Sequence, residues 1–169
     1  MNGDSRPAVA PAPAWPQAEP RAYTLHPGDV VCADRGDRMD TLLGSCVAIV
    51  LTDPRRTVGA MCHIVHSGDR CASDATAAHA HVALDTMYRL LRRRGIVPAL
   101  CQAFVYGGGN MFPDMMPGPQ VGEGNAQWAL HALQRDGIRV LEAEVGGTCY
   151  RRLSWTVGPQ LPHATAVPV

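Results

Sequence analysis

Cys46 and His63 are the residues of this sequence best suited to covalent chemistry. A cysteine attacks as its thiolate, and a neighbouring base is one means of forming that thiolate. Cys46 follows Gly44-Ser45, a turn of small residues that can leave backbone N–H groups free to face a developing oxyanion. His63 is the candidate base. The arrangement predicts acyl chemistry at a carboxamide.

Two apolar segments must pair as neighbouring strands to bring these side chains together. Residues 47–52 are nearly all apolar, which is typical of a strand buried on both faces, and residues 58–66 form the second segment. The Asp-Pro-Arg-Arg sequence at residues 53–56 predicts the turn that joins them. Pairing across this turn would place His63 close to Cys46.

Two amphipathic helices and further strands complete the predicted fold. One helix is expected to start at Ser73 or Asp74 and to end at Arg94 before Gly95. The other is expected to start with Asn125 as its N-cap. Further strands are predicted over residues 23–32, 100–106, 138–145 and 153–157, with a charged loop over residues 34–40. This mixture predicts an α/β or α+β fold with a mixed sheet.

Composition limits the domain organisation and the partners. The 169 residues are enough for one domain, and 15 basic against 15 acidic side chains give no net charge to attract nucleic acid or a membrane surface. Residues 1–20 are rich in Pro and Ala, and we expect them to be disordered. They resemble neither a signal peptide nor a membrane span, which predicts a cytoplasmic protein with reduced cysteines. Residues 21–158 are expected to form the domain, and residues 159–169 a loosely ordered tail.

Two other interpretations compete for the same residues. A lone cysteine is more often a buried structural residue than a nucleophile. A zinc site has enough potential ligands in Cys62, His63, His66, Cys71, His79 and His81. Strand alternation argues against zinc, because it turns His63 away from Cys62 and His66. The triple glycine at residues 107–109 lacks the pattern of a phosphate-binding loop and predicts a tight turn close to another strand.

Five sequence runs together resemble the chemoreceptor glutamine deamidase family, CheD. In chain order they are LLGSCVAIVLTD, VGAMCHIVHSG, YGGGNMF, VGEGN and GGTCYRR. The resemblance covers about residues 27 to 155. It implies a layered α/β sandwich with mixed sheets and two main helices packed outside. It also implies a protein-glutamine glutaminase, an amidohydrolase that needs no cofactor or metal, with Cys46 as nucleophile and His63 as base.

The resemblance further implies partners and marks two departures from the family pattern. The expected partners are methyl-accepting chemotaxis receptors and a CheC-type phosphatase, and the protein is expected to be a monomer. A threonine that orients the histidine in the family falls at the position of Asp40 here, so either Asp40 or the adjacent Thr41 could take this role; Thr41 is preferred. Tyr150 stands where the family usually has a small residue. These departures leave open an alternative function, a chemotaxis adaptor or binding module with little catalysis.

Overall fold

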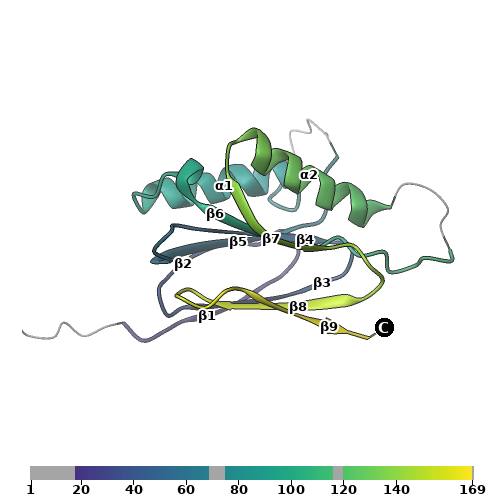
Figure 1. Cartoon of the computed structure of the whole chain (residues 1–169), viewed down its shortest axis with the longest axis horizontal. Coiled ribbons are helices and arrows are strands. Elements are labelled where there is room, and N and C mark those ends of the chain that lie inside the picture. The colour runs from purple at the N-terminus through teal and green to yellow at the C-terminus, as the bar shows by residue number, and fades with distance from the viewer. Residues whose placement is uncertain (1–17, 69–74, 116–119, 169) are drawn as a thin grey trace, which may run out of the picture.

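Two β-sheets lie face to face, and two helices cover the outer face of one of them (Figure 1). The computed structural model describes residues 18–68, 75–115 and 120–168. The strand order is β2-β5-β4-β6-β7 in the larger sheet and β1-β3-β8-β9 in the smaller one. Both sheets are mixed, since β6 and β7 pair in parallel, as do β1 and β3, while their other pairs are antiparallel. The predicted α/β class with mixed sheets and two outer helices is confirmed.

The elements alternate between the two sheets along the first part of the chain, from β1 to β4. The strands of the five-stranded sheet are β2 (Val30–Asp34), β4 (Val47–Thr52), β5 (Val58–Ile64), β6 (Gln102–Gly107) and β7 (Arg139–Val145). The strands of the four-stranded sheet are β1 (Ala22–Leu25), β3 (Arg38–Leu43), β8 (Tyr150–Thr156) and β9 (His163–Val167). The helices are α1 (Ala80–Arg93) and α2 (Val121–Arg135), with a 3₁₀ turn η1 (Pro98–Leu100).

The central strands β4 and β5 are buried along their whole length. Strand alternation divides their side chains between two cores. Ile49 and Cys62 face the helices, whereas Val50 and Met61 face the four-stranded sheet. A strand with a covered face on each side needs apolar residues at every position, which explains the continuous apolar run of β4.

Helix α1 packs on the five-stranded sheet through the predicted stripe, of which Ala83, Met87 and Leu91 are fully buried. The helix ends as predicted, with Gly95 at a left-handed φ of +74° after its last turn. It begins at Ala80, and the predicted start at Ser73 or Asp74 lies outside the described residues.

Two sequence predictions outside the central strands are wrong. The charged segment expected to be a loop over residues 34–40 runs into β3, where Met39, Thr41 and Leu43 are buried and the residues that alternate with them, Arg38, Asp40 and Leu42, are not. The tail expected to be loosely ordered contains β9, which pairs with β8 over residues 163–167. In both cases pairing with another strand, the distant β8 for β3 and the preceding β8 for β9, outweighs a weak local pattern.

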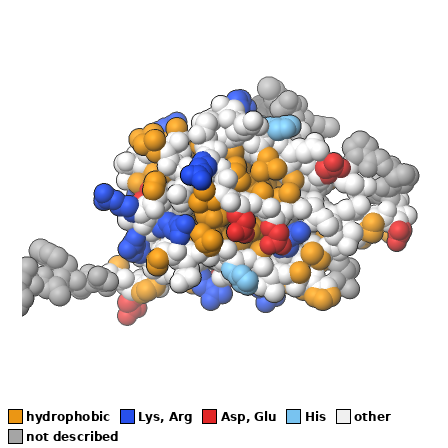
Figure 2. Space-filling view, in the orientation of Figure 1, with side chains coloured by type: hydrophobic (Ala, Val, Ile, Leu, Met, Phe, Trp, Pro, Cys, Tyr) orange, Lys and Arg blue, Asp and Glu red, His pale blue; other side chains and the backbone are white. Residues whose placement is uncertain are grey.

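The face of the molecule drawn in Figure 2 carries charges of both signs. In the view of Figure 2, hydrophobic side chains gather over α2 and β7, acidic side chains lie beside them, and basic side chains are spread around the molecule. This dispersion agrees with the zero net charge. Neither α1 nor α2, the two α-helices of the described chain, has the length and apolar content needed to cross a membrane.

Candidate active site

A buried hydrogen bond between the two sheets joins Thr41 of β3 to His63 of β5. The distance from Thr41 Oγ1 to His63 Nδ1 is 2.8 Å, and both side chains are 3% exposed. The Thr41 hydroxyl donates its only hydrogen to Leu25 O, at 2.8 Å, and must therefore accept from His63 Nδ1–H. The hydrogen-bond network thus assigns the tautomer in which Nδ1 carries the proton and Nε2 carries a lone pair.

His63 Nε2 is buried and has no hydrogen-bond partner within the described part of the chain. Burial lowers the pKa of His63 below its ordinary value, although the neighbouring Leu25 carbonyl opposes this effect. The imidazole is therefore neutral near pH 7. A neutral ring with an open, unprotonated nitrogen is suited to accept a proton.

Cys46 lies in the turn that leads into β4, on the same face of the sheet as His63. Its half-buried side chain packs against the core between the two sheets. Ala48, two residues later, also faces this core and pairs directly with His63 in the β4–β5 ladder. Diagonal neighbours of this kind are within reach of each other's side chains. The structure therefore brings Cys46, His63 and Thr41 to one region, without a hydrogen bond between the thiol and Nε2.

Burial raises the pKa of the Cys46 thiol, and no cation among the described residues opposes this effect. The resting pair is consequently a neutral thiol and a neutral imidazole, and deprotonation of Cys46 depends on transfer to His63. This differs from the sites in which a stable thiolate pairs with an imidazolium.

The turn that carries Cys46 is anchored through its carbonyl groups. Gly109 N–H donates to Gly44 O and Gly108 N–H donates to Cys46 O, each at 2.8 Å, while the Asn125 side chain donates to Ser45 O at 3.2 Å. Because a trans peptide is planar, each N–H points away from the carbonyl of the preceding residue. The N–H groups of Ser45 and Cys46 therefore point away from these anchors.

The triple glycine forms the support of this turn, as the sequence predicted. Gly107 has a left-handed φ of +107°, and a Cβ at this position would overlap Cys46 O. Gly108 has a φ of +66°, and a Cβ at this position would lie 2.6 Å from Gly122 O in the first turn of α2. Side chains at these positions would push the backbone away from Cys46.

Asp40 takes no part in the hydrogen bond to His63. Its carboxylate pairs with Arg38 on the exposed face of β3, with an Nε–Oδ2 distance of 2.8 Å. Consecutive residues of a strand face opposite sides, so Asp40 and Thr41 cannot both face His63. Of the two residues left open by the sequence, Thr41 is the one that contacts the imidazole.

Tyr150 lies against the turn. A Cβ on Gly44 would lie 3.0 Å from Tyr150 Cε1 and 3.1 Å from Met111 Sδ. Tyr150 is larger than the small residue that the family usually has at this position, and it fits because Gly44 has no side chain. Gly146 and Gly147 take φ values of +82° and +75° and make the loop before Tyr150.

Asn125 is a site residue that the sequence analysis placed wrongly. It was expected to be the N-cap of a helix, but α2 begins at Val121 after Gln120, and Asn125 lies inside the helix and is 1% exposed. Its Nδ2 bonds both Ser45 O and Val65 O. An Asn before an apolar stripe has the same local pattern in either position, so the sequence offered no signal for this role.

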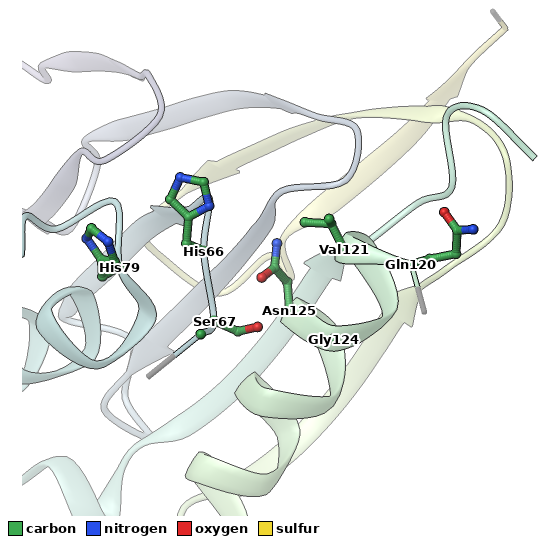
Figure 3. A pocket seen from close by; sticks show the side chains of 8 residues that line it. His66, Ser67, His79, Gln120, Val121, Gly124 and Asn125 are labelled. Carbon is green, nitrogen blue, oxygen red and sulfur yellow. The ribbon is translucent and has the colours of Figure 1, made fainter. Parts of the chain in front are cut away.

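One cavity lies beside the site rather than on Cys46 or His63. It has a volume of about 590 Å³, and Figure 3 shows His66 and His79 on one side of it and Asn125 and Val121 on the other. The rings of His66 and His79 are 5.6 Å apart. Among residues 18–68, 75–115 and 120–168 there is no group of three or more potential metal ligands; Cys71, part of the zinc interpretation, lies outside these ranges.

These observations define a two-sheet α/β protein in which a half-buried cysteine shares a core face with a Thr-oriented, neutral histidine. Comparison with known families gives a particular assignment. The profile of the family CheD, described as chemotactic sensory transduction, matches residues 66–158. Curated relatives extend the match over more of the chain, and the chain belongs to the CheD family.

Three of these relatives carry closely related names. "Probable chemoreceptor glutamine deamidase CheD 2" of Albidiferax ferrireducens is 36% identical over 138 residues, which are 79% of this chain and 80% of the relative. "Probable chemoreceptor glutamine deamidase CheD" of Pseudomonas fluorescens is 35% identical over 76% of this chain and 75% of its own. "Probable chemoreceptor glutamine deamidase CheD 2" of Geobacter sulfurreducens is 32% identical over 79% and 82%, respectively.

Proposed function

We propose that this protein hydrolyses the side-chain amides of specific glutamines on methyl-accepting chemotaxis receptors, yielding glutamate and ammonia. The names of its relatives supply the substrate class. The observation that carries the chemistry is the Thr41–His63 hydrogen bond, which leaves His63 Nε2 unprotonated on the face shared with Cys46.

The proposed reaction has two halves that use the same two side chains. As the Cys46 sulfur attacks the amide carbon, His63 Nε2 takes the thiol proton, and the resulting imidazolium gives it to the departing nitrogen, which leaves as ammonia. This forms a thioester. His63 then takes a proton from water as the water oxygen attacks the thioester carbon, and it returns the proton to sulfur as the carboxylic acid is released. The acid ionises to glutamate.

Two features of the site fit this sequence of proton transfers. Burial raises the pKa of Cys46 and lowers that of His63, so the proton stays on sulfur until substrate arrives. Thr41 then stabilises the imidazolium by accepting from Nδ1–H throughout. We assign no metal or organic cofactor to the reaction.

The Gly44-Ser45-Cys46 turn is the proposed oxyanion site. The carbonyls of Gly44 and Ser45 accept from Gly109 N–H and the Asn125 amide, and the N–H groups of Ser45 and Cys46 point away from these bonds. One such donor contributes about 3 kcal/mol to a transition state with a developing oxyanion. The substrate amide oxygen would take this position.

The same proposal covers partners and location. The protein would act as a cytoplasmic monomer on the receptors' cytoplasmic helices, and a CheC-type phosphatase is the proposed second partner. The new carboxylates would serve as methylation sites, so that deamidation tunes chemotactic signalling.

Receptor cytoplasmic fragments provide the test. Wild-type protein is expected to produce mass shifts of single glutamine-to-glutamate conversions, with stoichiometric ammonia release. Cys46→Ala is expected to abolish both while keeping the circular dichroism spectrum and unfolding temperature of the wild type. Turnover retained in the folded Cys46→Ala protein would defeat the proposal.

A second function, docking to receptors or a phosphatase with little catalysis, draws on one specific observation. Tyr150 and Met111 lie against Gly44 and narrow the space beside the turn that carries Cys46. If these side chains exclude a glutamine, the Tyr150→Gly variant should gain deamidase activity that the wild type lacks.

A further inference from the structure

Asn125 makes two buried hydrogen bonds that converge on the candidate site from helix α2. Its Nδ2 donates to Ser45 O at 3.2 Å and to Val65 O at 3.0 Å, which uses both hydrogens of the amide. The side chain is 1% exposed. Figure 3 shows it projecting from α2 toward the segment that contains His66 and Ser67.

The two carbonyls belong to the place where β4 and β5 separate. The last pair of their ladder at this end is Val47 with Ile64. Ser45 lies two residues before that pair on one strand, and Val65 lies one residue after it on the other. Asn125 therefore bridges the two chains just beyond the ladder, next to Cys46 on one side and two residues from His63 on the other.

The amide orientation is fixed by these bonds. A flipped amide would place its oxygen against two carbonyl oxygens, so only the observed orientation is compatible with both contacts. Asn125 Oδ1 is then left buried without a partner among the residues that the structure describes. A buried, unpaired acceptor destabilises the fold, so the presence of Asn125 at this position calls for an explanation.

We infer that Asn125 is a positioning residue, which holds the Cys46 thiol within reach of His63. By fixing Ser45 O it fixes the plane of the Ser45–Cys46 peptide, and with it the direction of the Cys46 N–H and the start of the Cys46 side chain. By fixing Val65 O it sets how far the His63 strand diverges. The inference rests on the proposed function for its catalytic consequence, but the thiol–imidazole geometry that it concerns can be measured without substrate.

Thr52 supplies a matched control at the opposite end of β4. It is fully buried, and its hydroxyl donates to Val58 O at 2.8 Å, so it too ties β4 to β5 through a backbone carbonyl. Thr52→Val removes a buried donor of the same kind, far from Cys46. The stability lost in Thr52→Val shows how much of the change in the Asn125 variants comes from removing a buried hydrogen bond alone.

The test compares Asn125→Ala, Asn125→Asp and Thr52→Val with the wild type. We expect kcat for ammonia release to fall about 10- to 100-fold in both Asn125 variants, the range associated with a misplacement of about 1 Å, with KM little changed. Alkylation of Cys46 by iodoacetamide, read site by site by mass spectrometry, should slow in parallel. Thr52→Val should lower the unfolding temperature and leave both rates unchanged per folded molecule.

The alkylation arm decides the inference even if the proposed function fails. Slower alkylation of Cys46 in the Asn125 variants than in Thr52→Val supports the positioning role, and equal rates overturn it. Absence of ammonia release from the wild type would instead reject the deamidase proposal. Asn125→Asp keeps the size of the side chain and replaces Asn125→Ala if the smaller residue prevents folding.

Discussion

The two ends of the β4–β5 pair differ in how their buried polar groups are hydrogen-bonded. At the turn end, the Asp53 carboxylate accepts from Thr57 N–H, the Thr57 hydroxyl and Val58 N–H at 2.8–3.0 Å. Burial alone would raise the pKa of Asp53, but these bonds lower it. At the other end, His63 Nε2 and Asn125 Oδ1 are buried and unpaired in the described chain.

Unpaired atoms at the turn end are of a different kind. Arg56 Nε and Gln102 Oε1 also lack partners there, within the described residues, but both belong to long side chains that are only half-buried, and the Arg56 guanidinium donates through Nη1 to Pro159 O. His63 and Asn125 are held rigidly by bonds at their other atoms. The turn end is arranged for stability, whereas the Cys46 end keeps a base available at a cost in stability.

Of the changes that test this difference between the two ends, replacing the base His63 should have the largest effect, a loss of kcat. His63→Gln keeps a polar side chain that can bond Thr41 but cannot accept a proton from sulfur. We expect kcat for ammonia release to fall about 10²- to 10⁴-fold. A loss smaller than tenfold in the folded variant would show that His63 is not the base.

Removing the Thr41 hydroxyl, which orients His63, should lower kcat by a smaller factor. Thr41→Val leaves His63 Nδ1–H and Leu25 O without their partner and frees the imidazole to change tautomer. The expected loss in kcat is about 10- to 100-fold. Asp40→Ala is the control, since Asp40 lies one residue away on the exposed face; an equal loss in that variant would contradict the assignment to Thr41.

A change at the turn end should affect stability alone. Asp53→Ala leaves the N–H groups of Thr57 and Val58 without their acceptor, and we expect the free energy of unfolding to fall by about 2 kcal/mol. Denaturant unfolding measures this change. Alkylation of Cys46 should be unaffected, and a slowed reaction would mean that the two ends are coupled.

The smallest expected effect is a pH dependence of stability at the Cys46 end. Because the pKa of His63 is lower in the folded protein than its ordinary value of 6.5, the unfolded chain binds a proton first as the pH falls. The contribution of His63 to stability is therefore present above pH 6.5 and is lost progressively below it. Unfolding of wild type and His63→Gln at a series of pH values should show a difference that narrows on acidification; a constant difference would contradict the neutral, buried imidazole.

The sequence predicted the parts of this contrast that depend on local pattern. The apolar run of β4, the turn at residues 53–56 and the alternation that separates His63 from Cys62 were all readable, and they place His63 opposite Ala48. Part of β3 could also have been recognised, since Met39 and Thr41 alternate with the charged residues Arg38 and Asp40, although Leu42 breaks the pattern. Their charged neighbours instead suggested a loop.

What the sequence could not supply are contacts between distant segments. The parallel pairing of β1 with β3 brings Leu25 beside Thr41 and provides the carbonyl that accepts the hydroxyl hydrogen. The bonds from Asn125 span 80 and 60 residues. Neither contact has a periodicity or a spacing to reveal it, so the support of the site emerges only from the fold.

Site-resolved alkylation of the cysteines tests the central claim most directly. Cys46, Cys32 and Cys149 are all half-buried, so burial alone predicts similar slow reaction for the three thiols. If His63 activates Cys46, its alkylation by iodoacetamide near pH 7 should be much faster than that of the other two in the wild type and should fall to their level in His63→Gln. Equal rates for all three thiols in the wild type would contradict an activated nucleophile at Cys46.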